Sequence, residues 1–359
     1  MADAPLRPYP RQAIEKMAPY VPPTSSRQGK LRLDFNENTA GCSPRVIQAL
    51  KKQLTREALT IYPEYSEACR QFAPHLGVQP EEILFTNGTD EAIHAVISTY
   101  VDPGDEVLIP WPTFPMFRFY PEVPGAVPRT VPYRQPDLTF PLEELCEAIT
   151  PQTRAILIAN PNNPTGTAIG LAEIETILRR AGGVAVMIDE AYFEFYGVTA
   201  RDLIPRYPNL FVSRTFSKVY GLAALRIGYL MSQPENIKIM RKSQSPYSVN
   251  RAAVVCALAA LEDQDYIRAY VSEALASREM LYRGLKRLKV PYYRSEANFV
   301  LAQFGDRAKD VCRLLREKGI LIRDRTHELA GTARITAGKK AHTRQLLGAL
   351  KEVLAECGR

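Results

Sequence analysis

Short apolar runs alternate with helical segments through the middle of the chain. Runs rich in Ile, Leu, Val and Phe predict strands over 83–85, 106–109, 155–159, 184–188, 210–212 and 226–230. Two segments between these runs, 91–100 and 171–181, are helical in character, and Gly182 and Gly183 follow the second as a C-cap. Strands that alternate with helices indicate a mainly parallel α/β sheet, so we expect one large domain over 44–270.

The pattern changes near residue 250. Residues 250–288 are rich in Ala, Leu, Glu and Arg and contain no proline, which predicts a long helix or a helix pair leaving the large domain. Beyond it, strand-like and helical runs are mixed over 298–304, 309–318, 320–323, 333–336 and 342–356. This mixture predicts a small α+β domain over 271–359.

The opening of the chain is rich in proline, which favours extended backbone and blocks helix interiors. We therefore expect residues 1–43 to form an arm that packs on the small domain or on a dimer partner. The sequence contains no internal repeat and no flexible linker.

Composition narrows the class of protein without naming a function. Of the 359 residues, 46% are hydrophobic and 24% are charged, values typical of a globular protein, so disordered and fibrous classes are excluded. The net charge is +7, but Lys and Arg are spread among Asp and Glu, which favours small anionic substrates over nucleic acid.

Cysteines and apolar stretches bear on the compartment. The six cysteines form no CxxC pair and no metal-ligand spacing, which predicts reduced thiols, no metal and a cytoplasmic protein. The N-terminus has no apolar signal-peptide core, and no run approaches the roughly 18 apolar residues of a membrane span. We expect neither secretion nor membrane insertion.

The run VAVMIDEAY places two acids at the end of a predicted buried strand. Asp189 and Glu190 come at its carboxyl end, where α/β sheets collect ligands. An apolar strand ending in Asp-Glu is also typical of the magnesium-binding strand of a P-loop ATPase. That alternative requires a GxxxxGK[ST] loop, and the chain contains none.

The run RTFSKVYGLAALRIGY surrounds one lysine with phosphate-binding groups. Lys218 follows a predicted strand, with Thr215 and Ser217 just before it and Arg226 eight residues later. A single lysine is normally exposed and solvated. Two hydroxyls and an arginine beside a desolvated amine are instead suited to a cofactor that carries both a phosphate and an aldehyde.

Two further motifs end strands with turns. In LFTNGTDEAI a strand, a glycine turn and a helix follow one another, so Gly88, Thr89 and Asp90 would offer amides and a hydroxyl to an anion, although an ordinary N-cap has the same pattern. In ANPNNPTG, a strand end leads into a Pro/Asn/Gly turn that carries Asn163, and a simple tight loop would look alike.

Together these motifs resemble the fold-type I aminotransferases that depend on pyridoxal 5′-phosphate. The resemblance is carried, in order, by TNGTDEA, WPTF, NPNNPTG, MIDEAY, TFSK with Arg226, and ARIT, and it covers residues 33 to 336. It implies an α/β fold in which helices sandwich a mainly parallel central sheet in the large domain, next to a small α+β domain. It also implies pyridoxal 5′-phosphate as the cofactor.

The resemblance assigns a role to each matching residue. Lys218 would hold the cofactor and move the proton at the substrate's α-carbon, and Asp189 would pair with the pyridine nitrogen. Asn163 and Tyr192 would bond the phenolic oxygen, and Phe114 would stack on the ring. The residues implied around the cofactor phosphate are Gly88, Thr89, Asp90, Thr215, Ser217 and Arg226, with Tyr62 from a second subunit.

Within this group the chain is most similar to histidinol-phosphate aminotransferases. The similarity lies in MAPYVP, LDFNENTAGCSP, IYPEY, SPYSVN, SEANFVL, and IRDRT followed by ARIT. It implies a homodimer that converts histidinol phosphate and 2-oxoglutarate to imidazole-acetol phosphate and glutamate, in histidine biosynthesis. The implied substrate residues are Tyr20, Asn36, Asn163, Arg323 and Arg334, and the two arginines would receive phosphate or carboxylate groups.

Two positions depart from that family's pattern, and three alternatives stay open. Thr39 stands where Pro is usual, and Phe114 where Tyr is usual. An aromatic amino acid aminotransferase would share the cofactor residues, and a threonine-phosphate decarboxylase would share a phosphate-bearing substrate. A cofactor-binding transcriptional regulator would need a DNA-binding module, for which the roughly 30 residues before the resemblance begins are too few.

Overall fold

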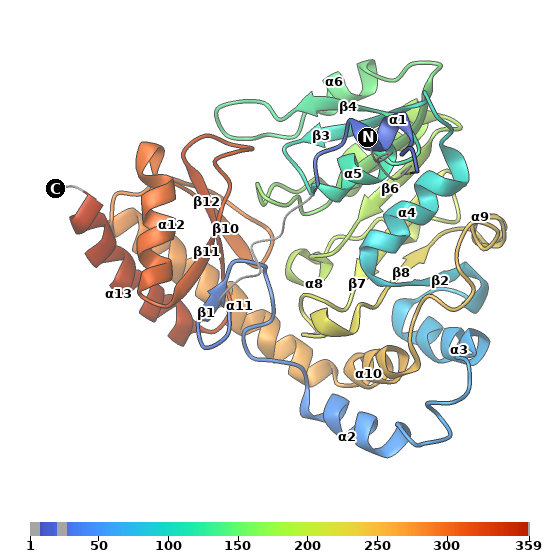
Figure 1. The fold of residues 1–359 in the computed structure, drawn as a ribbon, viewed down its shortest axis with the longest axis horizontal. Coiled ribbons are helices and arrows are strands. Elements are labelled where there is room, and N and C mark those ends of the chain that lie inside the picture. The colour runs from blue at the N-terminus through green and yellow to red at the C-terminus, as the bar shows by residue number, and fades with distance from the viewer. Residues whose placement is uncertain (1–7, 20–26, 358–359) are drawn as a thin grey trace, which may run out of the picture.

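A computed structural model describes residues 8–19 and 27–357 of the chain (Figure 1). A seven-stranded sheet and a five-stranded sheet form the cores of two bodies, joined by the long helix α11 (Gln264–Arg287). The larger sheet has the order β2-β8-β7-β6-β5-β3-β4. Its strands are β2 (Ile83–Thr86), β3 (Glu106–Trp111), β4 (Val127–Pro132), β5 (Thr153–Ala159), β6 (Ala185–Asp189), β7 (Leu210–Thr215) and β8 (Gly228–Met231). From β4 to β7 every neighbouring pair is parallel, whereas β8 pairs antiparallel with both β7 and β2.

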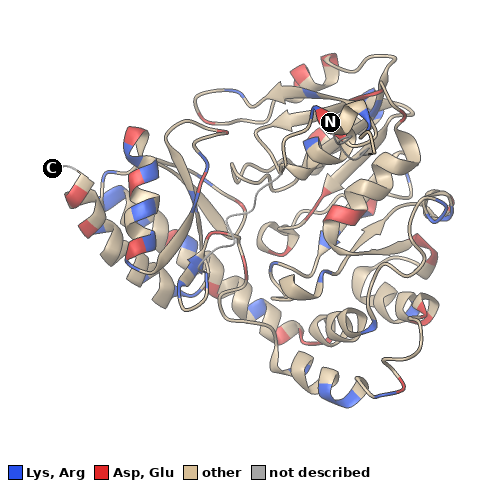
Figure 2. Ribbon diagram, in the orientation of Figure 1, with Lys and Arg blue, Asp and Glu red and all other residues tan. Residues whose placement is uncertain are grey.

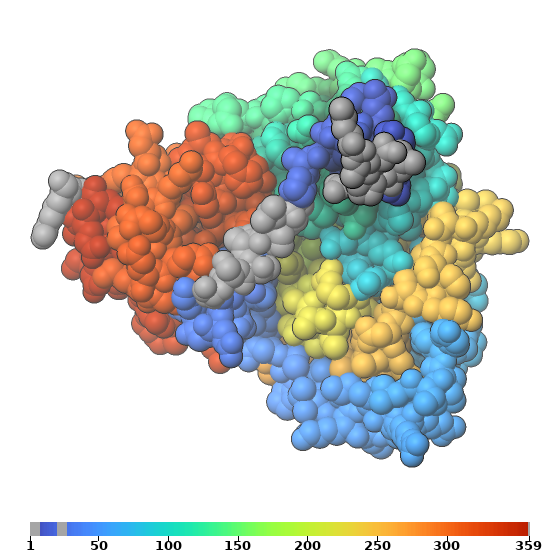
Figure 3. All heavy atoms as spheres, viewed as in Figure 1, coloured from blue at the N-terminus to red at the C-terminus, as the bar shows by residue number. Residues whose placement is uncertain are grey.

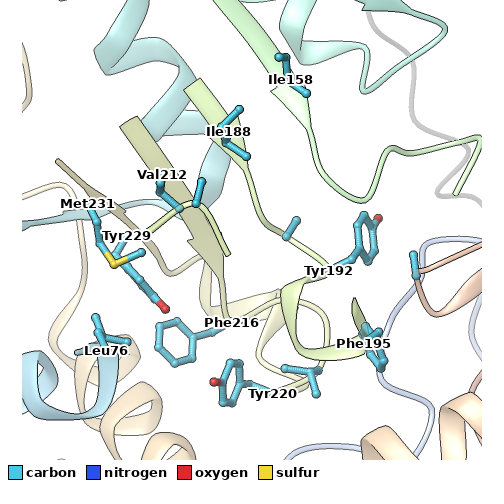
Figure 4. Packing of buried hydrophobic residues seen from close by; sticks show 14 of the residues in the cluster. Leu76, Ile158, Ile188, Tyr192, Phe195, Val212, Phe216, Tyr220, Tyr229 and Met231 are labelled. Carbon is cyan, nitrogen blue, oxygen red and sulfur yellow. The ribbon is translucent and has the colours of Figure 1, made fainter. Parts of the chain in front are cut away.

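The central strands are apolar on both faces because both faces are covered. In β5, Ile156 and Ile158 belong to one core cluster and Leu157 to another, so successive side chains enter opposite cores. Figure 4 shows part of the first cluster, which includes Ile188, Val212 and Met231. The helices of this body are α2 (Pro44–Gln53), α3 (Tyr65–Leu76), α4 (Gly88–Tyr100), α5 (Met116–Glu122), α6 (Leu142–Glu147), α7 (Leu171–Ala181), α8 (Phe193–Tyr196), α9 (Pro234–Met240) and α10 (Arg251–Glu262).

The smaller sheet has the order β1-β11-β12-β10-β9. Its strands are β1 (Leu31–Leu33), β9 (Tyr292–Tyr293), β10 (Phe299–Gln303), β11 (Ile320–Asp324) and β12 (Thr332–Thr336). The helix α12 (Ala308–Glu317) packs against β11 and β12, and α13 (Lys340–Cys357) packs against α11 and α12. β1 comes from the N-terminal part of the chain and pairs parallel with β11. Both α12 and α13 carry basic and acidic residues (Figure 2). No helix of residues 8–19 and 27–357 is long and apolar enough to cross a membrane.

The expected fold class is confirmed, and the mostly parallel sheet lies where the apolar runs predicted it. All six predicted strands of the large domain are present, and residues 250–288 contain a helix pair, α10 and α11. Three strands were not predicted, and one of them, β9, is only two residues long. β4 has the sequence VPRTVP and lies at the edge of its sheet, the place where strands tolerate proline, and β1 is three residues long.

The N-terminal segment contacts both bodies. The short helix α1 (Gln12–Glu15) lies near α5, and the Arg11 guanidinium next to it donates to the carbonyl oxygen of Val123 at 2.7 Å. In Figure 3 these dark-blue residues rest on the green segments of the larger body. Since β1 belongs to the other sheet, the described parts of this segment, residues 8–19 and 27–33, lie on different bodies. The predicted boundaries 1–43, 44–270 and 271–359 stay a prediction.

Candidate active site

One cavity collects nearly all of the predicted site residues between the two sheets. Its volume is about 270 Å³, close to the roughly 300 Å³ at which small-molecule sites begin. The predicted residues that line it are Asn36, Thr89, Asp90, Phe114, Asn163, Asp189, Tyr192, Thr215, Ser217, Lys218, Arg226, Arg323 and Arg334. Two predicted residues do not line the cavity: Gly88 lies against the guanidinium of Arg226, and Tyr62 is exposed on the surface. Tyr20 falls outside the described residues.

The carboxyl end of β6 delivers Asp189 to the cavity. Its carboxylate accepts a hydrogen bond from Ser213 Oγ at 2.9 Å, and burial raises its pKa to about 7. Glu190 points away and forms a buried ion pair with Arg214 at 2.9 Å. The two acids therefore do not share a ligand, and the described residues contain no cluster of His, Cys, Asp or Glu suited to a metal ion.

The turn after β7 presents Lys218 from the same sheet edge. Its Nζ donates to the carbonyl oxygen of Phe35 at 3.0 Å and lies 6.0 Å from the centre of the Tyr192 ring. Phe35 belongs to the loop between β1 and α2, residues 34–43. The amine is therefore held between the larger sheet and a loop that starts from the smaller sheet.

A set of anion-binding groups lies beside the lysine. Arg226 Nη1 lies 3.5 Å from Ser217 Oγ, and Nη2 lies 3.1 Å from the Asp90 carboxylate. α4 begins at Gly88, so its first amides face this region. Gly88 has φ +74°, which favours glycine, and a Cβ there would come within 2.7 Å of Arg226 Nη2, so a side chain at this position would displace the guanidinium from the helix N-terminus.

The opposite wall comes from the hairpin of β11 and β12. Arg323 and Arg334 are directly opposed in this antiparallel pair, an arrangement in which like charges repel. Arg334 is 4% exposed and donates to Asn163 Oδ1 and to the carbonyl oxygen of Asp34. Burial, with the charges of Arg325 and Arg323, lowers the pKa of Arg334 to about 9.

Sequence reasoning missed a third arginine on this wall. Arg325 lines the cavity and forms a buried ion pair with Glu328 at 2.9 Å. Arg325 directly follows β11 and stands two positions after Arg323, the spacing at which side chains of an extended segment face the same side. The β11–β12 hairpin, with its connecting loop, thus offers three guanidinium groups to the cavity.

Two predicted residues differ in setting. Phe114 lines the cavity and lies 6.3 Å from Phe117, edge to face. Tyr62 is 73% exposed and stacks on Tyr247 at 4.5 Å, away from the cavity of its own chain. Its contact with the cofactor requires a second subunit and stays a prediction.

Comparison with known proteins agrees with this architecture. Residues 28–350 match the aminotransferases of class I and II, and the chain belongs to that family. The chain is 36% identical to the histidinol-phosphate aminotransferase of Geobacillus sp. (strain WCH70), in an alignment that covers 96% of this chain and 97% of that protein. It is 34% identical to the histidinol-phosphate aminotransferase of Caldicellulosiruptor saccharolyticus, over 96% of this chain and 99% of that protein. The histidinol-phosphate aminotransferase of Sinorhizobium meliloti, solved in complex with pyridoxal-5′-phosphate, superimposes with a TM-score of 0.89 at 27% identity, over 97% of this chain and 98% of that one.

The cofactor of this chain is pyridoxal 5′-phosphate, and the residues of the cavity fit it. A phosphate matches the group formed by Arg226, Ser217 and the start of α4. A protonated ring nitrogen matches Asp189, whose charged form is costly while it lacks a positive partner. The amine of Lys218 lies on the same edge of the sheet.

Proposed function

We propose that the chain transfers the amino group of histidinol phosphate to 2-oxoglutarate, giving imidazole-acetol phosphate and glutamate, a step of histidine biosynthesis. The observation that carries the choice of substrate is the wall of Arg323, Arg325 and Arg334 facing Lys218 across one cavity. A phosphate monoester carries up to two negative charges, and paired guanidinium groups bind it with several charge-assisted hydrogen bonds. The names of the full-length relatives support the same substrate.

The phosphate end of the cofactor would be held where α4 begins. Arg226 supplies a charged donor, α4 supplies backbone amides, and nearby hydroxyls complete the site. The residues assigned to it are Gly88, Thr89, Asp90, Thr215, Ser217 and Arg226. Asp90 already holds Arg226 at 3.1 Å, so it orients the guanidinium.

The ring end would lie over the carboxyl ends of β6 and β7. When bound, the cofactor withdraws electrons from the substrate's α-carbon through its cationic ring. Asp189 keeps the ring nitrogen protonated, Asn163 and Tyr192 bond the phenolic oxygen, and Phe114 covers a ring face. Burial of Asp189 strengthens this charge pair, because the cavity screens it less than water does.

Lys218 is assigned the covalent attachment and the proton transfers. Its primary amine, when neutral, takes a proton from the substrate's α-carbon and returns one, acting as base and then as acid. The contact between Nζ and the carbonyl oxygen of Phe35 limits the directions that the amine can take. The loop after β1 therefore helps to aim the reacting nitrogen.

A homodimer in the cytoplasm completes the proposal. Several large apolar side chains are exposed on the single chain, as is typical of a surface that a second subunit covers. They are Ile47, Leu59, Ile61, Tyr62 and Tyr247. Tyr62 of a second copy would then reach the cofactor phosphate. All six cysteines are free thiols, which suits a reducing compartment.

The decisive experiment is a set of single half-reactions on cofactor-loaded protein, followed by the absorbance of the cofactor. We expect histidinol phosphate and glutamate to convert it, with histidinol phosphate the better donor. Faster conversion by phenylalanine or tyrosine would replace the proposal with an aromatic aminotransferase. Release of CO₂ from threonine phosphate would replace it with a decarboxylase, and conversion by no donor would contradict an enzymatic role.

A further inference from the structure

A chain of hydrogen bonds connects β12 to the hydroxyl of Tyr192. Thr336 Oγ1 lies 3.1 Å from the backbone nitrogen of Asn36 and 3.1 Å from Asn36 Oδ1, and Asn36 Nδ2 lies 2.8 Å from Tyr192 Oη. All three residues are buried, with exposed fractions of 0%, 1% and 4%. The chain therefore joins the smaller sheet to the turn that follows β6.

The direction of each hydrogen bond in the chain is fixed by its first member. The backbone N–H of Asn36 can only donate, so Thr336 Oγ1 accepts it and gives its own proton to Asn36 Oδ1. The Asn36 amide must then turn its NH₂ group toward Tyr192. Tyr192 Oη therefore accepts from Asn36, and no acceptor among the described residues takes the proton of Tyr192 itself.

The backbone of Asn36 supports this arrangement. It has φ +57°, in the left-handed region that Asn adopts more readily than most residues. The side-chain amide of Asn298 also donates to the Asn36 carbonyl oxygen at 3.2 Å. Hydrogen bonds therefore fix the backbone of Asn36 at both its N–H and its carbonyl oxygen, and the Thr336 hydroxyl fixes the orientation of its side-chain amide.

We propose that Thr336 and Asn36 are positioning residues that act through Tyr192 and commit its hydroxyl to donating a hydrogen bond to the cofactor's phenolic oxygen. This rests on the proposed function, in which Tyr192 bonds that oxygen. Thr336 stands two residues after Arg334 on β12, so both side chains leave the strand on the same face. The strand that binds the substrate's anionic group thereby also orients the cofactor.

The expected consequence is a change in the cofactor's spectrum with pH. A donated hydrogen bond stabilises the deprotonated phenolic oxygen, so its loss raises the pH at which the absorbance of the bound cofactor changes. Lys218 and Arg334 also lie near Tyr192, and the substitutions below leave both in place. We expect Thr336→Val to raise the midpoint pH of this absorbance change by about 0.5–1 pH unit, the shift that corresponds to one hydrogen bond. Thr336→Ser, which keeps a hydroxyl, should restore the wild-type midpoint.

Two comparisons separate this role from a loss of packing. Thr343 is 1% exposed, and its hydroxyl bonds Ser277 at 2.6 Å within the smaller body, so Thr343→Val is a matched control that should leave the midpoint unchanged. In a Tyr192→Phe background, Thr336→Val should add nothing, because the group through which it acts is gone.

The outcomes distinguish this inference from the proposed function. An equal shift from Thr343→Val, or the same shift from Thr336→Val with and without the Tyr192 hydroxyl, would overturn the positioning role. If Thr336→Val leaves the pH midpoint of the cofactor's absorbance unchanged while the wild-type protein transaminates, the positioning role is overturned and the proposed function stands. A wild-type chain that binds the cofactor but converts it with no amino donor would instead overturn the proposed function.

Discussion

The two walls of the cavity have opposite electrostatic demands. On the sheet edge at β6 and β7, burial raises the pKa of Asp189 to about 7, so its carboxylate calls for a positive partner. On the β11–β12 hairpin, burial and neighbouring arginines lower the pKa of Arg334 to about 9, so its guanidinium calls for a negative partner. A cofactor with a cationic ring beside Asp189, together with a substrate whose anionic group lies beside Arg334, would compensate both buried charges. Under the proposed function, the sheet-edge wall serves the reaction common to all substrates, and the hairpin wall selects among them.

The largest effect should come from the lysine of the sheet-edge wall. Lys218→Ala removes the amine that carries the proton, so turnover should fall at least about 10⁴-fold with every amino donor. Steady-state assays with histidinol phosphate and glutamate measure it. An active Lys218→Ala protein would contradict the mechanism, and Lys238→Ala on α9, outside the cavity, is the matched control.

Asp189→Asn should come next, again with every donor alike. The amide keeps the shape but cannot hold the ring nitrogen protonated, so kcat should fall about 10²–10³-fold. Equal rates in variant and wild type would show that Asp189 does not pair with the ring.

The same substitution should stabilise the cofactor-free protein in a defined pH range. The folded carboxyl keeps its proton up to about pH 7 while the unfolded one loses it near 3.8, so wild-type stability falls as pH rises between these values. Asp189→Asn should therefore raise the free energy of unfolding by roughly 2–4 kcal/mol above pH 7 and by little near pH 4. Urea denaturation at the two pH values measures it, and a gain independent of pH would contradict the assignment.

The hairpin wall should discriminate between substrates. Arg323→Ala removes charge-assisted hydrogen bonds to a phosphate, so kcat/KM for histidinol phosphate should fall about 10–100-fold, and for glutamate much less. An equal fall in kcat/KM for the two substrates would show that the hairpin wall does not select between them. Arg313→Ala is a suitable control, since this arginine is 57% exposed and pairs with Asp310 on α12.

The smallest effect should come from Phe114→Tyr. The ring keeps its stacking area and gains a hydroxyl at a partly exposed position, so kcat/KM should change by less than about threefold. A change above tenfold for histidinol phosphate alone would place residue 114 with the selecting wall.

The two walls also differ in how far sequence predicts them. The sheet-edge wall is built from local motifs, each a strand followed by its own turn, so Asp189, Lys218 and Arg226 could be recognised one motif at a time. The hairpin wall depends on register, since only the pairing of β11 with β12 sets Arg323 opposite Arg334.

The loop after β1 lay furthest beyond prediction. Phe35 contacts Lys218 through its backbone carbonyl, which carries no sequence signal, and Asn36 meets Thr336 across 300 positions. Asn36 was predicted to line the substrate pocket; it does line the cavity, and its amide is engaged by Tyr192. Helix periodicity and strand composition hold no information about such distant contacts.

The place of β1 in the smaller sheet has a consequence for synthesis of the chain. β1 emerges from the ribosome early, yet it pairs with β11, and Asn36 bonds a residue of β12. Closing so long a loop is entropically costly and slow. A nascent chain can therefore complete most of its larger sheet while the amine of Lys218 still lacks Phe35 in its final place, and the cavity is finished only when the last strands are made.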